Sequence, residues 1–400
     1  MDSRSVSSRL RELLKFLSTV QGDLSNVTGP PSLLAPSSVV EVGHAYAQRP
    51  CAFAAPALEP SPSLRALRIL HWFLLSLRSQ LYVAGAPGVS IKKPLNAFLG
   101  ELFFASWNDE ESKCTTRLVA EQVSHHPPIT AMHIADSEHG IRADGYARVE
   151  MTFNGAVNIR QVGHAMVHID KYEEDHLVPL VDVKVRGFLG GCMYPEITDT
   201  YEIVSSAGYI TEICFSGEGM ISGKRNSFKA RVYEKGDTKR CRPLYEATGV
   251  WSKGWSVKDV GTGERMEEFE VEVDAPGNEP VAMSIAPLEE QDEWESRRAW
   301  AGVLAGMAAG DMRAVLAEKT KIEQAQRQLR AREREEGKKW EPLLFRSQEG
   351  VEHKAFHELA EGTGWRLWDE RTKGVWRLDE GKATEKGQGE TFRGELTPLG

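Results

Sequence analysis

The sequence has few cysteines and no long apolar run. Its five cysteines are odd in number and show no Cys-x-x-Cys spacing, so neither a disulfide framework nor a cysteine-based zinc site is indicated, and a reducing compartment fits. The most apolar stretch, residues 69–77, is nine residues long, about half of what a membrane-spanning helix needs. The first residues show no apolar core followed by a small-residue cleavage site. We therefore expect neither a transmembrane helix nor a secretory signal.

The chain also has fewer basic than acidic side chains. The chain has 49 Lys and Arg against 58 Asp and Glu, a net charge of −9 at pH 7, which argues against a protein that coats nucleic acid through bulk charge. Any anion-binding site must therefore be local. With 41% hydrophobic and 27% charged residues among 400, the composition is that of a globular chain, and the collagen-like, disordered and fibrous classes are excluded.

Periodicity divides the chain into helical and β-rich parts. Residues 63–82 are apolar almost all round a helical wheel, which predicts a buried helix. Between about residues 101 and 274 the pattern has period two, and many short strands without long helices between them indicate one large antiparallel sheet or barrel. Helical periodicity returns over residues 289–309 and 311–336, with Gly310 as the break.

Both ends of the chain carry apolar side chains that need partners. Residues 5–20 predict a short amphipathic helix, which either packs on its own domain, or forms a movable flap, or lies in a membrane interface. The tail beyond Gly337 is dense in charge, yet it carries large apolar rings that we expect to anchor it to the sheet domain. The apolar arc of the first segment includes Leu10, Leu13, Leu14 and Leu17, and the rings of the tail are Trp340, Trp365, Trp368 and Trp376.

The octapeptide Glu121–Pro128 is the most unusual segment. Its two prolines lack backbone donors and push His126 out of the helical region, so both histidines are expected at a strand end or turn. Because adjacent residues of an extended chain point to opposite faces, a zinc site that uses both His125 and His126 is not favoured. Nucleophilic attack by Ser124 would need a base and a third group that the sequence does not supply.

Two other charged segments are ambiguous in isolation. Lys93 and Asn96 flank a proline where the helical part meets the β-rich part, and exposed lysines before a turn are common. Lys319, Glu323 and Arg327 are spaced i, i+4 and i+8 along one helix face. Taken alone they would form a solvated ladder worth about 0.2 to 0.5 kcal/mol per pair.

Together these segments resemble the lipid-binding domain of the oxysterol-binding protein family, whose signature is the octapeptide at residues 121–128. The resemblance covers roughly residues 10–345, and its layout is similar to that of short fungal members that consist of this domain alone. Further segments that resemble family segments, in the family's order, are 92–101, 161–164, 223–230, 287–291 and 295–300.

The resemblance implies an α+β, β-dominated fold, with a large incomplete antiparallel β-barrel around an apolar tunnel and helices at both ends. Residues 1–29 would form an N-terminal lid over one bound lipid, and residues 346–400 a tail packed on the domain. The lipid-binding domain at residues 30–345 would comprise a helical part (30–100), the barrel (101–280) and the C-terminal helices (281–336).

The resemblance also implies a lipid transfer protein with no catalytic residue, metal or cofactor, which exchanges sterol for phosphatidylinositol 4-phosphate. Its alternatives are an exchanger of phosphatidylserine for the same phosphoinositide, or a lipid sensor that regulates partners. A lipid hydrolase using Ser124 and His125 is the competing reading from another class. As a transfer protein it would be cytoplasmic, peripheral at membranes of endoplasmic reticulum and Golgi type, and without a nucleic-acid partner.

By residue-by-residue match, the phosphoinositide head group would be held by seven side chains. A monoester phosphate needs convergent donors with net positive charge, which three cations and two histidines supply, while the glutamate can accept from an inositol hydroxyl. The seven residues are Lys93, Asn96, His125, His126, Lys319, Glu323 and Arg327.

The sterol tunnel is implied by a second set of positions. Besides the lid leucines it includes Tyr46, Gln80, Leu81 and Gln161. Gln80 and Gln161 match positions where short sterol-binding members present polar groups near the sterol hydroxyl. The sequence departs from those members at Tyr46, where they have Trp, and at Leu81, where they have Tyr.

Overall fold

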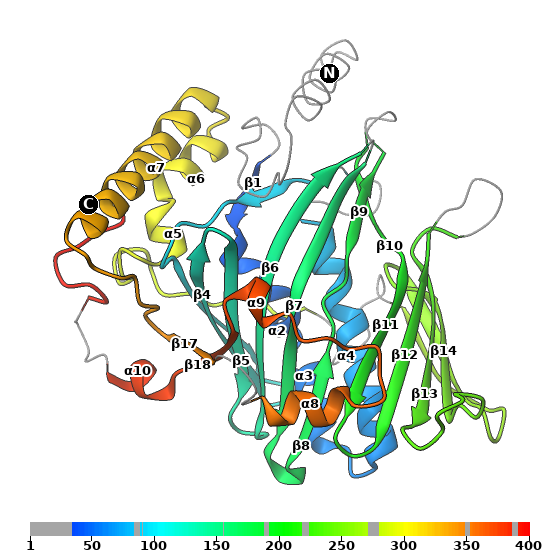
Figure 1. The fold of residues 1–400 in the computed structure, drawn as a ribbon. Helices are drawn as coiled ribbons and strands as arrows, with labels where there is room; N and C mark the ends of the chain where they lie inside the picture. Colours follow the sequence, from blue (N-terminus) through cyan, green and yellow to red (C-terminus); the bar gives the residue numbers. More distant parts are fainter. Residues whose placement is uncertain are drawn as a thin grey trace.

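A sheet of 14 strands dominates the fold (Figure 1). The computed structural model describes residues 34–83, 89, 91–154, 156–187, 192–217, 224–270, 280–348, 353–385 and 391–400. The strands of this sheet are β3 (Leu102–Asp109), β4 (Cys114–His125), β5 (Pro128–Asp136), β6 (Ile141–Phe153), β7 (Val157–Ile169), β8 (Glu174–Val178), β9 (Val183–Arg186), β10 (Tyr194–Ile197), β11 (Asp199–Ser205), β12 (Tyr209–Ser216), β13 (Ser227–Glu234), β14 (Tyr245–Val250), β15 (Gly254–Asp259) and β16 (Arg265–Glu270).

The strand order follows the chain almost throughout. Neighbours pair antiparallel from β3 to β8, then β8 pairs with β11 and the meander continues to β16, while β9 pairs with β7 and with β10. The end strands β3 and β16 do not pair with each other, so the sheet curves without closing. The predicted incomplete antiparallel barrel is therefore confirmed.

One long helix lies inside the curve of the sheet. Helix α4 (Pro62–Leu81) begins with proline at its first turn, where a missing N–H costs nothing. Its residues are buried on nearly every side, as the all-round apolar pattern predicted, and Phe73 and Leu74 share one core with Trp251 and Trp255 of the sheet region. Before α4 come the short helices α2 (His44–Ala47) and α3 (Pro50–Leu58).

Two strands lie in the part expected to be helical. Strands β1 (Leu34–Ser38) and β2 (Lys93–Leu95) pair in parallel. Each is too short for a period-two pattern to show, and the partners are separated by α4, so no local signal marks them. The part predicted as helical, residues 30–100, therefore also contains one pair of short strands.

The C-terminal helices are α5 (Ser296–Ala299), α6 (Ala301–Ala308) and α7 (Met312–Glu335). The first starts later than the predicted residue 289, because acidic side chains bond to backbone N–H groups in a turn. The Asp292 carboxylate accepts from Trp294 N at 2.9 Å, and that of Glu295 accepts from Asp292 N at 2.8 Å. Gly310, with φ of +69°, separates α6 from α7 as predicted.

The segment before α5 runs along the outer side of β3. Leu102 N donates to Trp294 O at 2.9 Å, and Ser106 exchanges two backbone hydrogen bonds with Ser284 at 2.9 and 2.8 Å. These bonds occupy backbone groups of a strand that has a sheet neighbour on one side only.

The C-terminal tail packs on the domain. It contains β17 (Phe345–Gln348), α8 (Lys354–Ala360), α9 (Asp369–Thr372), β18 (Val375–Leu378) and α10 (Glu380–Glu385), and β17 pairs antiparallel with β18. Trp376 is buried, and Trp365 donates to Glu202 O at 3.1 Å. Near the end of the chain, Gln326 of α7 donates to Pro398 O at 2.8 Å.

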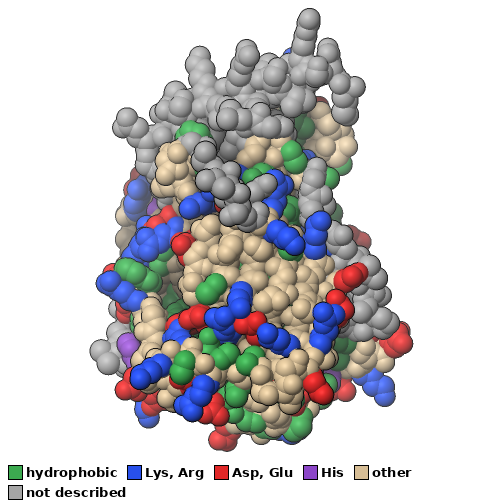
Figure 2. All heavy atoms as spheres, turned by 90° about the vertical axis from the view of Figure 1, so that its right-hand side faces the viewer, with side chains coloured by type: hydrophobic (Ala, Val, Ile, Leu, Met, Phe, Trp, Pro, Cys, Tyr) green, Lys and Arg blue, Asp and Glu red, His purple; other side chains and the backbone are tan. Residues whose placement is uncertain are grey.

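The surface carries both signs of charge. On the face that lies to the right in Figure 1, basic and acidic side chains are interspersed (Figure 2). Ion pairs also join neighbouring strands: Glu246 of β14 pairs with Lys229 and Arg231 of β13 at 2.8 and 2.9 Å. Within the described part of the chain, no helix is both long and apolar enough to cross a membrane.

Candidate functional site

The octapeptide forms the end of one strand and the turn to the next. Strand β4 ends at His125 and β5 begins at Pro128, so both histidines lie at a strand end or turn, as predicted. Their imidazole rings contact each other, with centroids 4.7 Å apart and planes at 68°. The expectation that they point to opposite faces is therefore wrong. His126 already lies in the turn, where the alternation of an extended strand no longer applies.

One of the two rings is fixed by the backbone. His125 Nδ1 lies 3.0 Å from Ala97 O, and because a carbonyl oxygen only accepts, Nδ1 carries the proton and Nε2 remains for a ligand. Burial lowers the pKa of His125, and the neighbouring His126 lowers it further. The ring is therefore neutral at pH 7 in the unliganded protein.

The residues assigned to the head group converge on one pocket of about 1240 Å³. Two come from β2 and the residues after it, two from the end of β4 and the turn after it, and three from successive turns of α7. Segments that are far apart in the sequence thus present cations, imidazoles and an amide to one volume. All seven predicted side chains line it: Lys93, Asn96, His125, His126, Lys319, Glu323 and Arg327.

Helix α7 contributes one charged face to this pocket. Lys319, Glu323 and Arg327 fall on one side of the helix because their spacing is close to whole turns. Lys319 is buried and forms an ion pair with Glu323. Since a buried ammonium is costly unless it is paired, the ion pair with Glu323 offsets the burial of Lys319 in the pocket wall.

An apolar cavity of about 280 Å³ lies next to the pocket. Its wall is built mainly from aliphatic side chains of β1, α4 and strands β5 to β9. Some polar groups in the wall are hydrogen-bonded to one another or to the backbone: Tyr46 OH donates to Gln80 Oε1 at 2.9 Å, and Gln161 Nε2 donates to Val181 O at 2.7 Å. The four predicted tunnel residues that the structure describes, Tyr46, Gln80, Leu81 and Gln161, all line this cavity.

The pocket and the cavity share a wall. Leu34 of β1 and Lys93 and Pro94 of β2 line both volumes. The parallel β1–β2 pair, which the sequence did not reveal, therefore stands where a charged site meets an apolar one. The predicted lid residues Leu10, Leu13, Leu14 and Leu17 lie outside the described residues.

Other side chains line the pocket without having been predicted, among them Arg330, Trp340 and Lys373. Arg330 lies 11 residues, about three helical turns, after Lys319, so extending the helical spacing would have found it. Trp340 lies under the Arg330 guanidinium, 4.8 Å from ring centroid to Cζ. Lys373 comes from the tail after α9, and no sequence pattern linked it to the octapeptide.

Ser124 does not have the neighbours of a nucleophile. Its Oγ accepts from Lys373 Nζ at 3.0 Å, while His125 Nδ1 bonds to Ala97 O. Among the described residues no hydrogen bond joins Ser124 to either histidine of the octapeptide. The arrangement of a serine with a base held by a third group is not formed.

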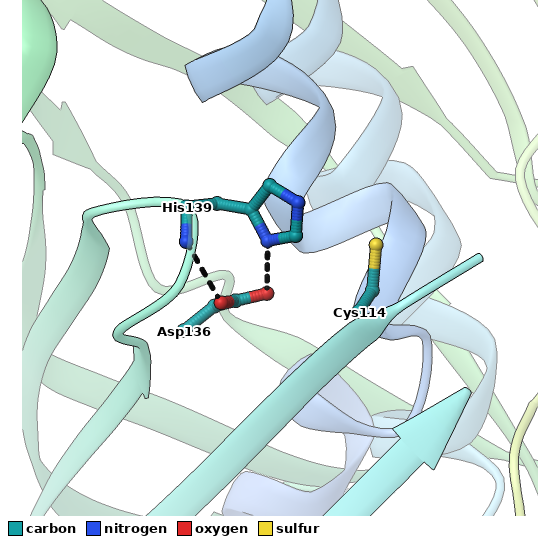
Figure 3. A group of neighbouring side chains, drawn as sticks. All are labelled: Cys114, Asp136 and His139. Atoms are coloured by element: carbon teal, nitrogen blue, oxygen red, sulfur yellow. Dashed lines mark hydrogen bonds and ion pairs between the residues drawn. The ribbon is translucent and has the colours of Figure 1, made fainter. Parts of the chain in front are cut away.

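A second group of metal-type ligands lies at the other end of β4 (Figure 3). Cys114, Asp136 and His139 place ligand atoms within 4.8 Å of one another. The Asp136 carboxylate already accepts from His139 Nδ1 at 2.9 Å and from the backbone N–H groups of Glu138 and His139 at 3.1 Å, which accounts for the turn after β5. Burial raises the pKa of the Cys114 thiol to about 12, whereas metal binding needs a thiolate. The positions of Asp136 and His139 are therefore explained by the hydrogen bonds of the β5–β6 hairpin turn.

Sequence comparison places the chain among known proteins. Residues 12–303 match the family described as oxysterol-binding protein. The chain is 43% identical over 389 residues to the probable transporter efuK of Hormonema carpetanum, covering 97% of this chain but 54% of that protein. It is 36% identical over 333 residues to protein kes1 of Schizosaccharomyces pombe, covering 83% of this chain and 85% of that one. The chain thus spans about half of the first relative's length and most of the second's.

Solved structures share the fold. The Osh1 ORD domain in complex with ergosterol aligns with a TM-score of 0.68 at 20% identity, over 88% of this chain and 89% of that one. The Osh3 ORD in complex with PI(4)P from Saccharomyces cerevisiae aligns with a TM-score of 0.64 at 18% identity, over 90% and 95%. At this level of identity the likeness establishes the fold.

Proposed function

The chain belongs to the oxysterol-binding protein family, and from that premise we propose that it is a lipid transfer protein that exchanges a sterol for phosphatidylinositol 4-phosphate between membranes. It binds one lipid at a time and performs no covalent step. It works peripherally, at membranes of endoplasmic reticulum and Golgi type. One observation carries the proposal: a pocket rich in cations shares the Leu34–Lys93–Pro94 wall with an apolar cavity.

The charged pocket suits a phosphorylated inositol ring. A phosphate monoester carries about −1.5 to −2 charge at neutral pH and has several acceptor oxygens. Lys93, Lys319 and Arg327 supply positive charge, and the two histidines supply donors directed from the β4 turn. Glu323 can accept from a ring hydroxyl while it holds Lys319 in place. Charge-assisted hydrogen bonds of this kind are among the stronger ones in proteins.

The apolar cavity suits the rest of a lipid. Each buried CH₂ group contributes about 0.8 kcal/mol, so the aliphatic wall favours either the acyl chains of a phospholipid or a sterol body. The Tyr46–Gln80 pair and Gln161 are the polar groups that a sterol hydroxyl could meet. Since Lys93 and Pro94 belong to both volumes, a lipid whose head fills the pocket crowds the mouth of the cavity, which makes the two ligands competitors.

Solved structures of the same fold support both the sterol and the phosphoinositide part of the proposal. An ORD domain of the same fold is titled as a complex with ergosterol, and another as a complex with PI(4)P. These are properties of those proteins. We apply them to this chain for two reasons. It shares the fold, and the seven side chains that match the family's head-group residues line one pocket here.

Transfer between two liposome populations tests the proposal. One population contains phosphatidylinositol 4-phosphate, the other a fluorescent sterol, and each lipid is followed separately. We expect the two lipids to move in opposite directions and each to accelerate the other. Movement of the phosphoinositide alone would contradict sterol exchange, and phosphatidylserine would then be supplied as the counter-lipid.

Variants separate the head-group site from the fold. Replacing Lys93, His125 and His126 by alanine should abolish extraction of the phosphoinositide while sterol binding persists. Lys354→Ala, on an exposed part of α8, is the control and should behave as wild type. Loss of both ligands together would indicate misfolding. Cleaved lipid would support the hydrolase reading, and binding without transfer would support a sensor.

A further inference from the structure

The C-terminal tail forms part of the wall of the charged pocket. Lys373, Trp376 and Ser347 line it together with the histidines of the β4 turn, although they lie beyond residue 303, where the family match ends. We propose that Lys373 is an additional phosphate-binding residue, which donates to the same monoester phosphate as His125 and His126. This inference rests on the proposed function.

The ammonium group of Lys373 is placed against the octapeptide itself. Its Nζ lies 3.0 Å from Ser124 Oγ and 2.9 Å from the backbone oxygen of His126. Both acceptors are neutral, and a lysine has three donors. Two donors therefore fix the group beside the histidine pair, and the third remains for a ligand in the pocket.

The electrostatic surroundings of Lys373 favour an anion. Burial lowers its pKa, and the nearby Arg148 guanidinium lowers it further. A cation that is partly desolvated next to another cation gains from a phosphate more than a fully hydrated lysine does. The phosphate would thus relieve a repulsion that the unliganded protein contains.

The backbone holds Lys373 in one place. It caps the C-terminal end of α9 with a left-handed φ of +55°, and its carbonyl accepts from Ser347 Oγ at 2.6 Å. Gly374 follows with φ of +96°, and a Cβ there would lie 2.6 Å from Gln348 O. The turn is therefore packed against β17, so the lysine is presented by a rigid element rather than by a loose chain end.

The experiment compares Lys373→Asn with Lys373→Arg in the whole chain of 400 residues. Asparagine tolerates the left-handed conformation, so the turn is kept while the charge is lost, and arginine keeps the charge. Vesicles containing phosphatidylinositol 4-phosphate are compared with vesicles containing phosphatidylinositol, which lacks the monoester phosphate. Lys354→Asn, an exposed tail lysine on α8, is the matched control. Melting temperature and sterol binding are measured for every variant.

We expect Lys373→Asn to weaken binding of the phosphorylated lipid by roughly three- to tenfold, to leave phosphatidylinositol and sterol binding unchanged, and to be rescued by Lys373→Arg. Phosphoinositide binding by Lys373→Asn within twofold of wild type would overturn the inference, and so would an equal loss for all three lipids, which indicates a purely structural lysine. If the wild-type chain itself binds no phosphatidylinositol 4-phosphate, the proposed function fails and this inference with it.

Discussion

Glu121, the first residue of the octapeptide, is bonded to the backbone of Leu343. Its Oε1 accepts from Leu343 N at 2.7 Å, and its Oε2 accepts from Leu344 N at 2.8 Å. The carboxylate is fully buried. Strand β4 is thereby tied to the segment that follows α7, so the octapeptide organises the tail as well as the histidines.

We predict that Glu121→Ala lowers the free energy of unfolding by about 2 to 4 kcal/mol, because the buried N–H of Leu344 and the partly buried N–H of Leu343 lose their acceptor. Urea denaturation measures the change. Glu358→Ala, at a mostly exposed position paired with Lys354 at 3.6 Å, should change stability by less than about 0.5 kcal/mol. Equal effects of the two substitutions would show that the Glu121 contacts do not stabilise the fold.

A second buried carboxylate should make stability depend on pH. Burial raises the pKa of Glu101 to about 7; its Oε2 accepts from Trp300 Nε1 at 2.9 Å, while its buried Oε1 lacks a partner. A folded-state pKa above the unfolded value of about 4.5 means that the stabilising contribution is complete below that value and is lost as the pH rises through 7.

We therefore expect Glu101→Gln, which stays neutral, to gain stability relative to wild type by up to about 3 kcal/mol between pH 5 and pH 8. Thermal or urea unfolding across this range measures the difference. Glu264→Gln, at an exposed position in the turn before β16, should show a difference that does not vary with pH. A constant difference for Glu101→Gln as well would mean that Glu101 ionises normally in the folded chain.

Head-group binding should tighten as the pH falls from 7.5 to 6.5. Burial holds the pKa of His125 below its usual value in the free protein, and a bound phosphate would raise it, so binding takes up a proton. One proton taken up gives at most about a tenfold change per pH unit. Equilibrium binding to phosphoinositide vesicles should show the trend in wild type and in His357→Gln, an exposed control on α8. His125→Gln should flatten it, and a flat wild-type profile would rule the mechanism out.

The Tyr46 hydroxyl should matter for the sterol only. Tyr46→Phe removes the donor to Gln80 Oε1 and leaves that carbonyl unsatisfied beside the apolar cavity, so we expect sterol affinity to fall roughly three- to tenfold. Phosphoinositide extraction should stay at the wild-type level. Tyr245→Phe, which loses a hydroxyl contact to Ser63 at 3.1 Å outside the cavity, is the control. Unchanged sterol affinity in Tyr46→Phe would place the sterol hydroxyl elsewhere.

Local periodicity explains what the sequence could predict of the fold. Helix α4 and the strands from β3 to β16 each carry their own repeat of apolar residues, so their existence and type are readable from short windows. Strands β1 and β2 carry no such repeat. Each depends on a partner strand from which α4 separates it along the sequence. The late start of α5 follows from side-chain bonds of Asp292 and Glu295, which compete with the helix.

The candidate site also contains residues that the sequence could group and residues that it could not. Lys319, Glu323 and Arg327 could be grouped from helical spacing alone, whereas their meeting with His125 depends on tertiary packing and was predicted only through the resemblance. Lys373 could not be predicted at all. It reaches Ser124 across 249 residues of sequence, from a tail to which no motif applies.

The segment that lies along β3 affects how readily the protein can aggregate at high concentration. A strand at the end of an open sheet offers unpaired N–H and C=O groups on which another molecule can build a continuous intermolecular sheet. Here Trp294 and Ser284 already take hydrogen bonds from Leu102 and Ser106. The protein thus covers the β3 edge with a piece of irregular backbone, and the barrel stays open without exposing that edge to a second molecule.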